Sequence, residues 1–493
     1  MPEAVLAVDL GTTRVKAAVV ALDGQVLASA EGGYPVLTDG EHGRAEQDAA
    51  VWWDAAREAI RTAVGRGRLP SEERGGAPRV VAACVGGQGP SVIAVDESGR
   101  PLAPAVIWMD GRSEAYRRAL EERGGAEVSR YAILPKAMLL LDRHPDVRER
   151  VRWLLQSWDY VAYRMTGSAV ASSFRGATVF PRDLVTAAGL DPATFPRELL
   201  MGEVGGTLRA DVAKDLGLEP GVPVAGGVND STATILGTGI VKKGLAIDYG
   251  GTSGGLGLAW DSRVAPPGTT AWPAAAPGLW ICGGALAAAG RSFVWLLETF
   301  GYARAGGTAP YGPTGANGAN AALADAARVP AGADGLVFLP YLAGERAPLW
   351  DPRAQGVLYG IRASHGREHI ARAVLEGVAY GLRHIADVLG EGGAQIRELR
   401  VSGGQAKGAL WNRIKADVLG VPVGVPKVLE GALLGYAMLA ATAAGEVKDA
   451  VTAADRFVRI AERIEPDTAN AGVYAERYAT YRELYPRLRD LGA

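Results

Sequence analysis

The chain has 493 residues, 48% of them hydrophobic, and single hydrophobic cores rarely grow beyond about 250–300 residues, so we expect two domains. Its 54 acidic and 52 basic residues leave a formal charge of −2 without a long run of one sign. This balance argues against nucleic acid or an anionic membrane as a partner, and it favours small molecules.

Cysteine content and the N-terminus bear on the compartment. Cys84 and Cys282 each lie in an apolar stretch without CxxC spacing, which favours structural roles in a reducing compartment. The first apolar segment follows no basic region, contains Asp9, and is far shorter than the ~20 residues of a membrane span. We therefore expect a cytoplasmic globular protein.

Apolar runs and turn residues predict the elements of the first half in order. Strands are expected at 4–8, 15–22 and 25–30, joined by a Gly-Thr-Thr turn and by Asp23-Gly24. A helix at 48–64 follows, then strands at 80–86 and 92–96. Amphipathic helical patterns occupy 112–122, 136–143 and 146–164.

The second half repeats this theme. Residues 244–261 again read as strand, Gly/Thr/Ser turn and strand, which suggests an internal duplication of one sheet-and-helix unit. We place the domain boundary near 240, giving domains 1–240 and 241–493. Residues 306–320 are rich in Gly, Thr, Ala and Asn and are expected to form a surface loop.

The two Gly/Thr turns are candidate phosphate-binding sites. Gly11, Thr12 and Thr13 form the first, and residues 250–253, with Gly251 and Thr252, form the second. Such turns direct several backbone N–H groups and hydroxyls one way, which suits phosphate oxygens, and Asp9 could hold the accompanying Mg²⁺. One such turn could be a simple hairpin with a surface acid. Two of them favour convergence on one nucleotide in a cleft.

A third glycine-rich segment lies near the C-terminal end. A strand over 399–402 ends in Gly403-Gly404, and a helix at 411–419 follows. Backbone without side chains would let a purine and its ribose approach closely. No GxxxxGK[ST] motif occurs, so we expect a phosphate site of another architecture than the P-loop.

At these residues the chain resembles the FGGY carbohydrate kinases, members of the actin-like, ribonuclease H-like ATPases. Residues 356–361, seven further residues and then 369–376 fit the family's C-terminal signature. Similar pieces run nearly end to end: AEQDAAVWW (45–53), IWMDGR (107–112), DYVAYRMTG (159–167), VAGGVNDSTA (224–233), FLPYLAGERAP (338–348) and EGALLGYAMLAA (430–441). The pattern is most similar to the xylulokinase-like branch.

The resemblance implies two ribonuclease H-like α/β domains with an active-site cleft between them. It also implies ATP- and Mg²⁺-dependent phosphorylation of a small sugar at a primary hydroxyl, with Asp230 as the catalytic base. The Asn229-Asp230 pair also suits a helix N-terminus, and this local role is compatible with catalysis. By the same resemblance Thr12, Thr13, Lys16 and Thr252 address the phosphates, and Gly290 and Gly404 border the nucleotide.

The acceptor site departs from the xylulokinase pattern. Gly89-Pro90 stands where that branch has Met-His, although Gln88 is retained, and ASSFRG (171–176) lacks the acid of the family motif. Gln88, Gly89, Trp108, Asp110 and Asp230 are the expected contacts to a ketose such as xylulose or ribulose, or to a polyol. A homodimer is an open option for the assembly.

Three alternatives compete with the kinase interpretation. Residues 251–255 match the GxSxG nucleophile elbow, which requires a helix directly after the serine, whereas GLGLAWD reads as a strand. Residues 365–369 match the zinc motif HxxEH, which requires both histidines on one helix, where Gly366 fits poorly. A regulator on the same fold would be expected to lose the base or to carry a DNA-binding segment. Most tryptophans, including Trp52, Trp53 and Trp295, are expected in the core.

Overall fold

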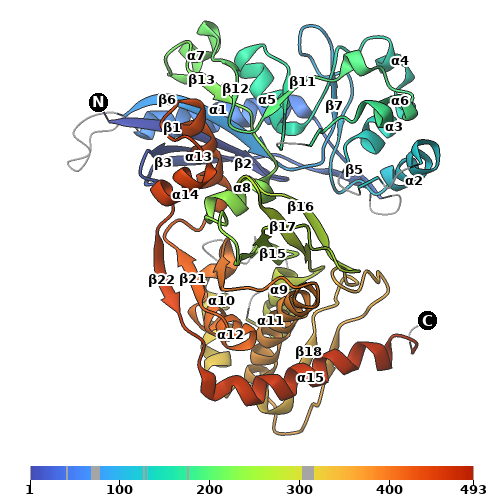
Figure 1. Ribbon diagram of the computed structural model, residues 1–493, viewed down its shortest axis with the longest axis vertical. Helices are drawn as coiled ribbons and strands as arrows, with labels where there is room; N and C mark the ends of the chain where they lie inside the picture. The colour runs from blue at the N-terminus through green and yellow to red at the C-terminus, as the bar shows by residue number, and fades with distance from the viewer. Residues whose placement is uncertain are drawn as a thin grey trace. The chain divides into compact units, whose positions relative to one another are not determined.

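The computed structural model describes residues 2–39, 43–67, 78–125, 128–129, 132–174, 177–302 and 316–491. The chain divides into two compact units, each built on a mixed sheet with helices (Figure 1). Unit 1 comprises residues 1–239 and 431–458, and unit 2 comprises residues 240–430 and 459–493. The expectation of an α/β fold with two domains is confirmed.

Unit 1 is centred on a six-stranded sheet. Its strands, in spatial order, are β12 (Val204–Thr207), β13 (Pro223–Ala225), β6 (Arg79–Gly87), β1 (Glu3–Leu10), β2 (Arg14–Ala21) and β3 (Val26–Gly33). Smaller sheets join β4 (Leu37–Asp39), β5 (Arg44–Gln47) and β8 (Ala105–Val106), β7 (Ile93–Val95) and β9 (Trp153–Leu155), and β10 (Val170–Ser173) and β11 (Arg197–Leu200).

The helices of unit 1 come from two separate stretches of chain. They are α1 (Ala49–Gly67), α2 (Ser113–Gly124), α3 (Leu134–Arg143), α4 (Pro145–Arg148), α5 (Ser157–Thr166), α6 (Arg182–Ala187), α7 (Ala210–Leu216), α8 (Asp230–Gly237), α13 (Gly431–Ala443) and α14 (Ala450–Phe457), with the short 3₁₀ turn η1 (Pro192–Thr194).

Unit 2 contains a seven-stranded sheet. In spatial order its strands are β16 (Thr270–Pro273), β17 (Trp280–Ala285), β15 (Gly255–Trp260), β14 (Leu245–Asp248), β20 (Glu398–Val401), β21 (Val423–Pro426) and β22 (Ile460–Ile464), and β18 (Val337–Leu339) pairs with β19 (Val357–Tyr359). Its helices are α9 (Ala289–Thr299), α10 (Ala316–Ala327), α11 (Arg367–Glu391), α12 (Ala409–Leu419) and α15 (Ala471–Leu488), with 3₁₀ turns η2 (Ala333–Gly335), η3 (Gly404–Lys407) and η4 (Thr468–Asn470).

The two sheets share one pattern of strand directions. From β3 to β12 the joins are antiparallel, antiparallel, parallel, parallel and antiparallel, and the joins from β17 to β22 follow the same series. The first hairpins, β1–β2 and β14–β15, carry the two Gly/Thr turns at equivalent places. This agreement supports the duplication expected from the sequence.

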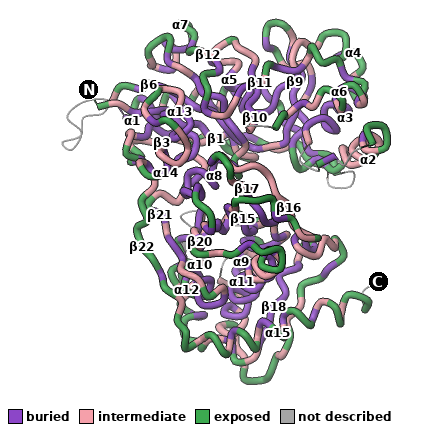
Figure 2. Tube along the Cα trace, viewed as in Figure 1, coloured by how far each residue is buried: buried purple, intermediate pink, exposed green. Residues whose placement is uncertain are grey.

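The central strand of unit 1 is buried on both faces (Figure 2). Ala4, Leu6 and Val8 of β1 belong to the core that includes α1. Because side chains alternate along a strand, Val5, Ala7 and Asp9 point to the opposite face. Helix α13 packs against β1 and β6, as Figure 1 also shows, and it covers that second face.

Three sequence expectations change in the structure. Residues 146–164 do not form one helix, because β9 interrupts the pattern by pairing with β7 and leaves α4 and α5 as separate helices. Residues 306–315 of the expected loop lie outside the described residues, and residues 316–320 begin α10. Residues 431–458, placed by the sequence analysis in the second domain, pack in unit 1, because α13 meets α8 and the sheet.

Helices α8 and α13 touch at their backbones through glycines. A Cβ atom added to Gly435 would lie 2.0 Å from the carbonyl oxygen of Ala233, and one added to Gly237 would lie 1.9 Å from that of Gly431. No side chain fits at such distances. These contacts fix α8, which begins at Asp230, against a segment that is distant in sequence.

We expect Gly435→Ala to lower the free energy of unfolding of unit 1 by about 1–3 kcal/mol, because the new methyl group overpacks the α8–α13 contact. Chemical denaturation with a unit 1 probe such as tryptophan fluorescence measures the change. Gly65→Ala in α1 is the matched control, since a Cβ atom there meets no atom within 4 Å. That control should gain up to about 1 kcal/mol from helix propensity. Equal stabilities for both variants would contradict the contact's importance.

Candidate active site

The first Gly/Thr turn of unit 1 is held by four hydrogen bonds from outside the hairpin. Gln47 Nε2 donates to the carbonyl oxygen of Thr12 at 2.7 Å, and Trp108 Nε1 donates to Thr12 Oγ1 at 3.0 Å. Tyr34 donates its hydroxyl to the carbonyl of Gly11 and its backbone N–H to that of Thr13. The turn is therefore a braced structure with Thr13 exposed at its tip.

Gln88 is joined to this turn through Gln47. Gln88 Nε2 donates to Gln47 Oε1 at 2.6 Å, and Trp52 Nε1 donates to the same oxygen at 3.1 Å. The carbonyl of Gln88 accepts a bond from Ser157 Oγ. Its side-chain Oε1 is buried without a hydrogen-bond partner among the described residues, so it can accept a bond from a ligand hydroxyl. Sequence reasoning missed Gln47, although the AEQDAAVWW motif contains it.

Trp108 and Asp110 lie in one segment but differ in environment. Trp108 is 45% exposed, whereas Asp110 is 3% exposed and binds Arg112 and the backbone N–H of Ala45. Burial alone would raise the pKa of Asp110, but the bonds from Arg112 and Ala45 hold it below its usual value. In this arrangement Asp110 anchors the loop that presents Trp108.

Asp230 is the first residue of α8. Asn229 caps the helix by accepting a bond from the N–H of Thr232, and Asp230 Oδ1 accepts one from the N–H of Ser231 at 2.7 Å. The backbone bridge between Gly87 and Asn229 sets this helix start at the end of β6. Solvent reaches the Asp230 side chain, yet desolvation by nearby protein atoms raises its pKa above the usual value.

Trp158 of α5 lies against the position that differs from the xylulokinase pattern. A Cβ atom on Gly89 would lie 2.8 Å from Cζ3 of Trp158 and 3.7 Å from Cβ of Asn229. The indole ring thus occupies the space that a side chain at position 89 would fill. The same space borders Asn229, the residue that precedes Asp230. Sequence reasoning did not single out Trp158, because only the fold brings α5 to this loop.

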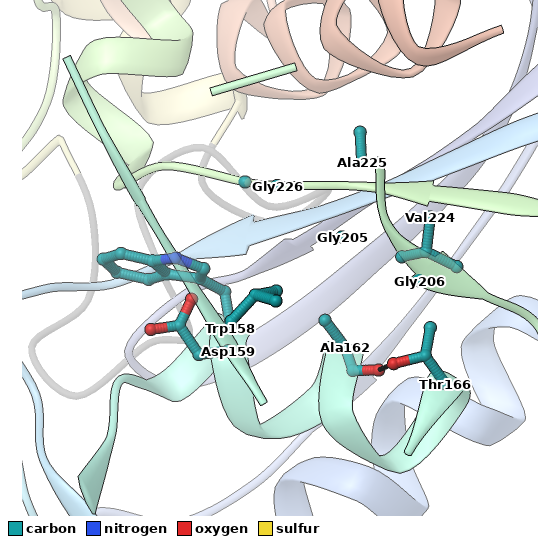
Figure 3. A pocket seen from close by; sticks show the side chains of 11 residues that line it. Trp158, Asp159, Ala162, Thr166, Gly205, Gly206, Val224, Ala225 and Gly226 are labelled. Carbon is teal, nitrogen blue, oxygen red and sulfur yellow. Dashed lines mark hydrogen bonds between the residues drawn. The ribbon is translucent and has the colours of Figure 1, made fainter. Parts of the chain in front are cut away.

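A small cavity opens behind this tryptophan (Figure 3). It is lined by Trp158, Asp159, Thr166 and glycines within β12 and directly after β13, and its volume is about 10 Å³. Burial raises the pKa of Asp159 to about 8. A space of this size holds about one water molecule, so it cannot take a sugar.

The acidic residues of unit 1 suit a magnesium ion that is held mainly by nucleotide phosphates. Among the described residues no group of three or more His, Cys, Asp or Glu side chains could hold a metal. Mg²⁺ commonly binds proteins through one or two carboxylates and keeps water and phosphate oxygens as its other ligands. Asp9, half-buried at the end of β1, fits that mode.

Unit 2 gathers the second turn, the start of α9 and the end of β20 in one place. A Cβ atom on Gly250 would lie 1.9 Å from the carbonyl of Ser402, and one on Gly290 would lie 2.6 Å from that of Gly251. The N–H of Arg291 donates to the carbonyl of Thr252. The predicted residues of this unit therefore lie together: Gly251, Thr252, Gly290, Gly403 and Gly404.

A buried ion pair holds this cluster from below. Lys415 and Asp248, both fully buried or nearly so, form a pair at 2.5 Å, and Asp248 Oδ1 accepts a bond from the N–H of Gly250. Lys415 also donates to Gln405 Oε1 at 3.3 Å, and Gln405 Nε2 donates to the carbonyl of Gly251. None of Lys415, Asp248 and Gln405 was proposed from the sequence. Lys415 in particular gave no signal, because a lysine on a helix usually faces solvent.

The competing motifs adopt other structures. Ser253 is followed by β15, not by the helix of a nucleophile elbow. His365 precedes α11 and accepts a bond from the N–H of Arg362, whereas His369 lies in the first turn and accepts one from that of Gly366.

Among the described residues no helix has the length and apolar character needed to cross a membrane.

Comparison with known proteins decides the family. The model for the FGGY family of carbohydrate kinases, N-terminal domain, matches residues 4–237, and that for the C-terminal domain matches residues 249–444. The chain belongs to this family. It is therefore a carbohydrate kinase, a phosphotransferase for which the family implies ATP as the phosphoryl donor.

Individual relatives are similar over most of their length. The solved structure of xylulose kinase from Rhodospirillum rubrum matches with a TM-score of 0.83 and 30% identity over 99% of both chains. The glycerol kinase of Aromatoleum aromaticum is 32% identical, covering 89% of this chain and 90% of its own. The gluconokinase of Bacillus subtilis strain 168 is 27% identical, covering 91% and 89%. The kinase is thus xylulokinase-like within a family of varied acceptors.

We expect Lys415→Met to destabilise unit 2 by about 3–5 kcal/mol, because it leaves the Asp248 carboxylate buried without its cation. Denaturant unfolding measures the loss, and Asp248→Asn/Lys415→Met should recover much of it. Lys243→Met is the matched control, since Lys243 pairs with Asp261 at the surface and such pairs contribute at most about 1 kcal/mol. Similar losses in both single variants would argue against a special role for the buried pair.

Proposed function

We propose that this kinase transfers the γ-phosphoryl group of ATP to a primary hydroxyl of a small ketose or polyol, with Asp230 as the general base. The observation that carries the proposal is that Asp230 directly follows Asn229, which bridges to Gly87 and lies close to Gly89. The carboxylate of Asp230 is open to solvent at the start of α8. The preceding residue, Asn229, lies close to Gly89, beside the ring of Trp158.

In the proposed reaction, the acceptor oxygen attacks the γ-phosphorus while its proton passes to a carboxylate oxygen of Asp230. The bond between the γ-phosphorus and the bridging oxygen breaks, and ADP leaves with the electron pair. Asp9 would hold the magnesium ion, which when bound neutralises charge on the phosphates. Thr12, Thr13 and Lys16 in unit 1 and the N–H groups of Gly251 and Thr252 in unit 2 would bind phosphate oxygens.

The acceptor end would be recognised by polar groups that unit 1 already orients. Gln88 Oε1 is a buried acceptor for a substrate hydroxyl, and the partly exposed ring of Trp108 offers an apolar face for carbon atoms. The ring of Trp158 fills the volume beside Gly89. An indole ring from α5 therefore lines the part of the site where xylulokinases have Met-His. The acceptor should therefore differ from D-xylulose in length or configuration.

Asp230→Asn should lower kcat by about 10²–10⁴, the usual effect of removing a general base, with KM for ATP little changed. Steady-state kinetics with a coupled ADP assay measures both. Asp211→Asn is the matched control, because Asp211 is also an exposed acid in the first turn of a helix but pairs with Arg209. Wild-type turnover of Asp230→Asn would remove Asp230 from the chemistry.

The pH dependence provides a second readout of the same residue. A base acts when ionised, and the pKa of Asp230 is raised, so the rate should increase with pH through a limb that lies above the ordinary aspartate value of about 3.9. This acidic limb should vanish from the residual activity of Asp230→Asn and persist in Asp211→Asn.

A coupled ADP-release screen over ketoses, aldonates and polyols of three to seven carbons should identify the acceptor. We expect D-xylulose to be at best a moderate substrate. A site that lacks the Met-His pair obtains little binding energy from the substrate hydroxyls that this pair would contact. D-ribulose, another pentulose or a polyol should have the higher kcat/KM. A value for D-xylulose at least about tenfold above every other compound would contradict this interpretation of Gly89.

A further inference from the structure

A buried tyrosine in unit 1 is assigned no part in the proposed reaction. Tyr436 of α13 is 0% exposed, and its hydroxyl makes no hydrogen bond among the described residues. Leaving a buried hydroxyl unpaired costs about 1–3 kcal/mol of stability, and a phenylalanine of the same shape would avoid that cost. An orphaned group of this kind calls for a reason.

The ring of Tyr436 is placed by a glycine on the central sheet. A Cβ atom on Gly86 would lie 1.9 Å from Cε1 and 2.3 Å from Cζ of the ring, so the phenol fills the position of a side chain there. The same Cβ atom would lie 2.5 Å from the carbonyl oxygen of Val228. The hydroxyl end of the ring therefore lies beside β6 and the segment that leads into Asp230.

Gly86 is also the register partner of Asp9. The two residues stand opposite each other on the parallel strands β6 and β1. Paired residues on neighbouring strands project to the same face, about 5 Å apart, so the phenol lies next to the Asp9 side chain on the face that α13 covers. The geometry brings the phenol next to Asp9 and beside the segment that leads into Asp230.

The electrostatics agree with this placement. Burial, and then the charges of Asp9 and Asp230, raise the pKa of Tyr436 well above its usual value of about 10. The buried Cys84 thiol on β6 acts in the same direction.

We propose that Tyr436 is a positioning residue for phosphoryl transfer. Its hydroxyl donates a hydrogen bond through one water molecule toward the carboxylates of Asp9 and Asp230, and this bond fixes the orientation of their oxygens. This inference rests on the proposed function, since it assigns Tyr436 a role through the proposed base and the proposed metal ligand. It explains why α13 retains an unpaired hydroxyl.

Tyr436→Phe separates this role from a structural one. The ring remains and only the hydroxyl is lost, so kcat should fall by about 10- to 100-fold, the size of one hydrogen bond to a charged group, with both KM values within about twofold. The Tm of the free protein should stay equal or rise, because an unpaired buried group has been removed. A structural role would lower Tm along with kcat, and unchanged kcat would overturn the proposal.

Tyr160→Phe is the matched control in the same unit. Tyr160 is also 0% exposed, but its hydroxyl accepts a bond from Arg164 at 2.9 Å. Its loss should lower Tm and leave kcat unchanged, the opposite of the result expected for Tyr436→Phe. The same response from both variants would show that any buried phenol in unit 1 behaves alike, and it would overturn the proposal.

A double-mutant cycle tests the route through Asp230. If Tyr436 acts by positioning the base, Asp230→Asn/Tyr436→Phe should be no slower than Asp230→Asn alone. Multiplied losses would contradict that route. Wild-type turnover of Asp230→Asn would overturn the proposed function itself, whereas a slow Asp230→Asn with a fully active Tyr436→Phe would overturn only the role of Tyr436.

Discussion

The absence of side chains where α8 meets α13 is the constraint on which the arrangement of unit 1 depends. Gly237 and Gly435 let two backbones approach to distances that exclude a Cβ atom. The contact joins a C-terminal segment to the first unit and so closes the face of the sheet that carries Asp9. The contact also holds the α13 segment that carries Tyr436 against the sheet, while the Gly87–Asn229 bridge sets the start of α8 at the end of β6.

The two units share a topology but use equivalent acids differently. Asp9 lies near the end of β1 and Asp248 at the end of β14, each just before a Gly/Thr turn. In unit 2 the acid is paired with Lys415 in the interior and serves to hold Gly250. In unit 1 the acid lies beside a neutral phenol. Divergence of one duplicated hairpin thus accounts for a structural acid in one unit and a candidate ligand in the other.

The sequence predicted those parts of the protein that depend on neighbouring residues. Hairpins with Gly/Thr turns and the helix start at Asn229-Asp230 are local patterns, and each is present. The helix expected over 146–164 is wrong because β9 gains its partner from β7, far away in sequence. A periodic pattern cannot report a strand that exists only through pairing.

The site shows the same division. Within each unit several of the residues named from motifs lie close together, but the groups that hold them in place are long-range contacts. Gln47 reaches Thr12 and Gln88, and Lys415 reaches Asp248 and Gln405, across separate elements. Nothing in the local sequence of α12 or β5 distinguishes these side chains from others of their type. Only the fold gives them partners.

Unpaired polar atoms in the interior carry the clearest functional information in this molecule. Most buried polar groups are hydrogen-bonded because the alternative lowers stability. Gln88 Oε1 and the Tyr436 hydroxyl are two of several atoms in unit 1 that depart from that rule. A phenylalanine in place of Tyr436 would fold at least as well, so stability alone does not explain this hydroxyl. An unpaired buried polar group lowers the stability of the free protein. Its presence is explained if a bound substrate, or a side chain that the substrate orders, supplies the missing hydrogen bond.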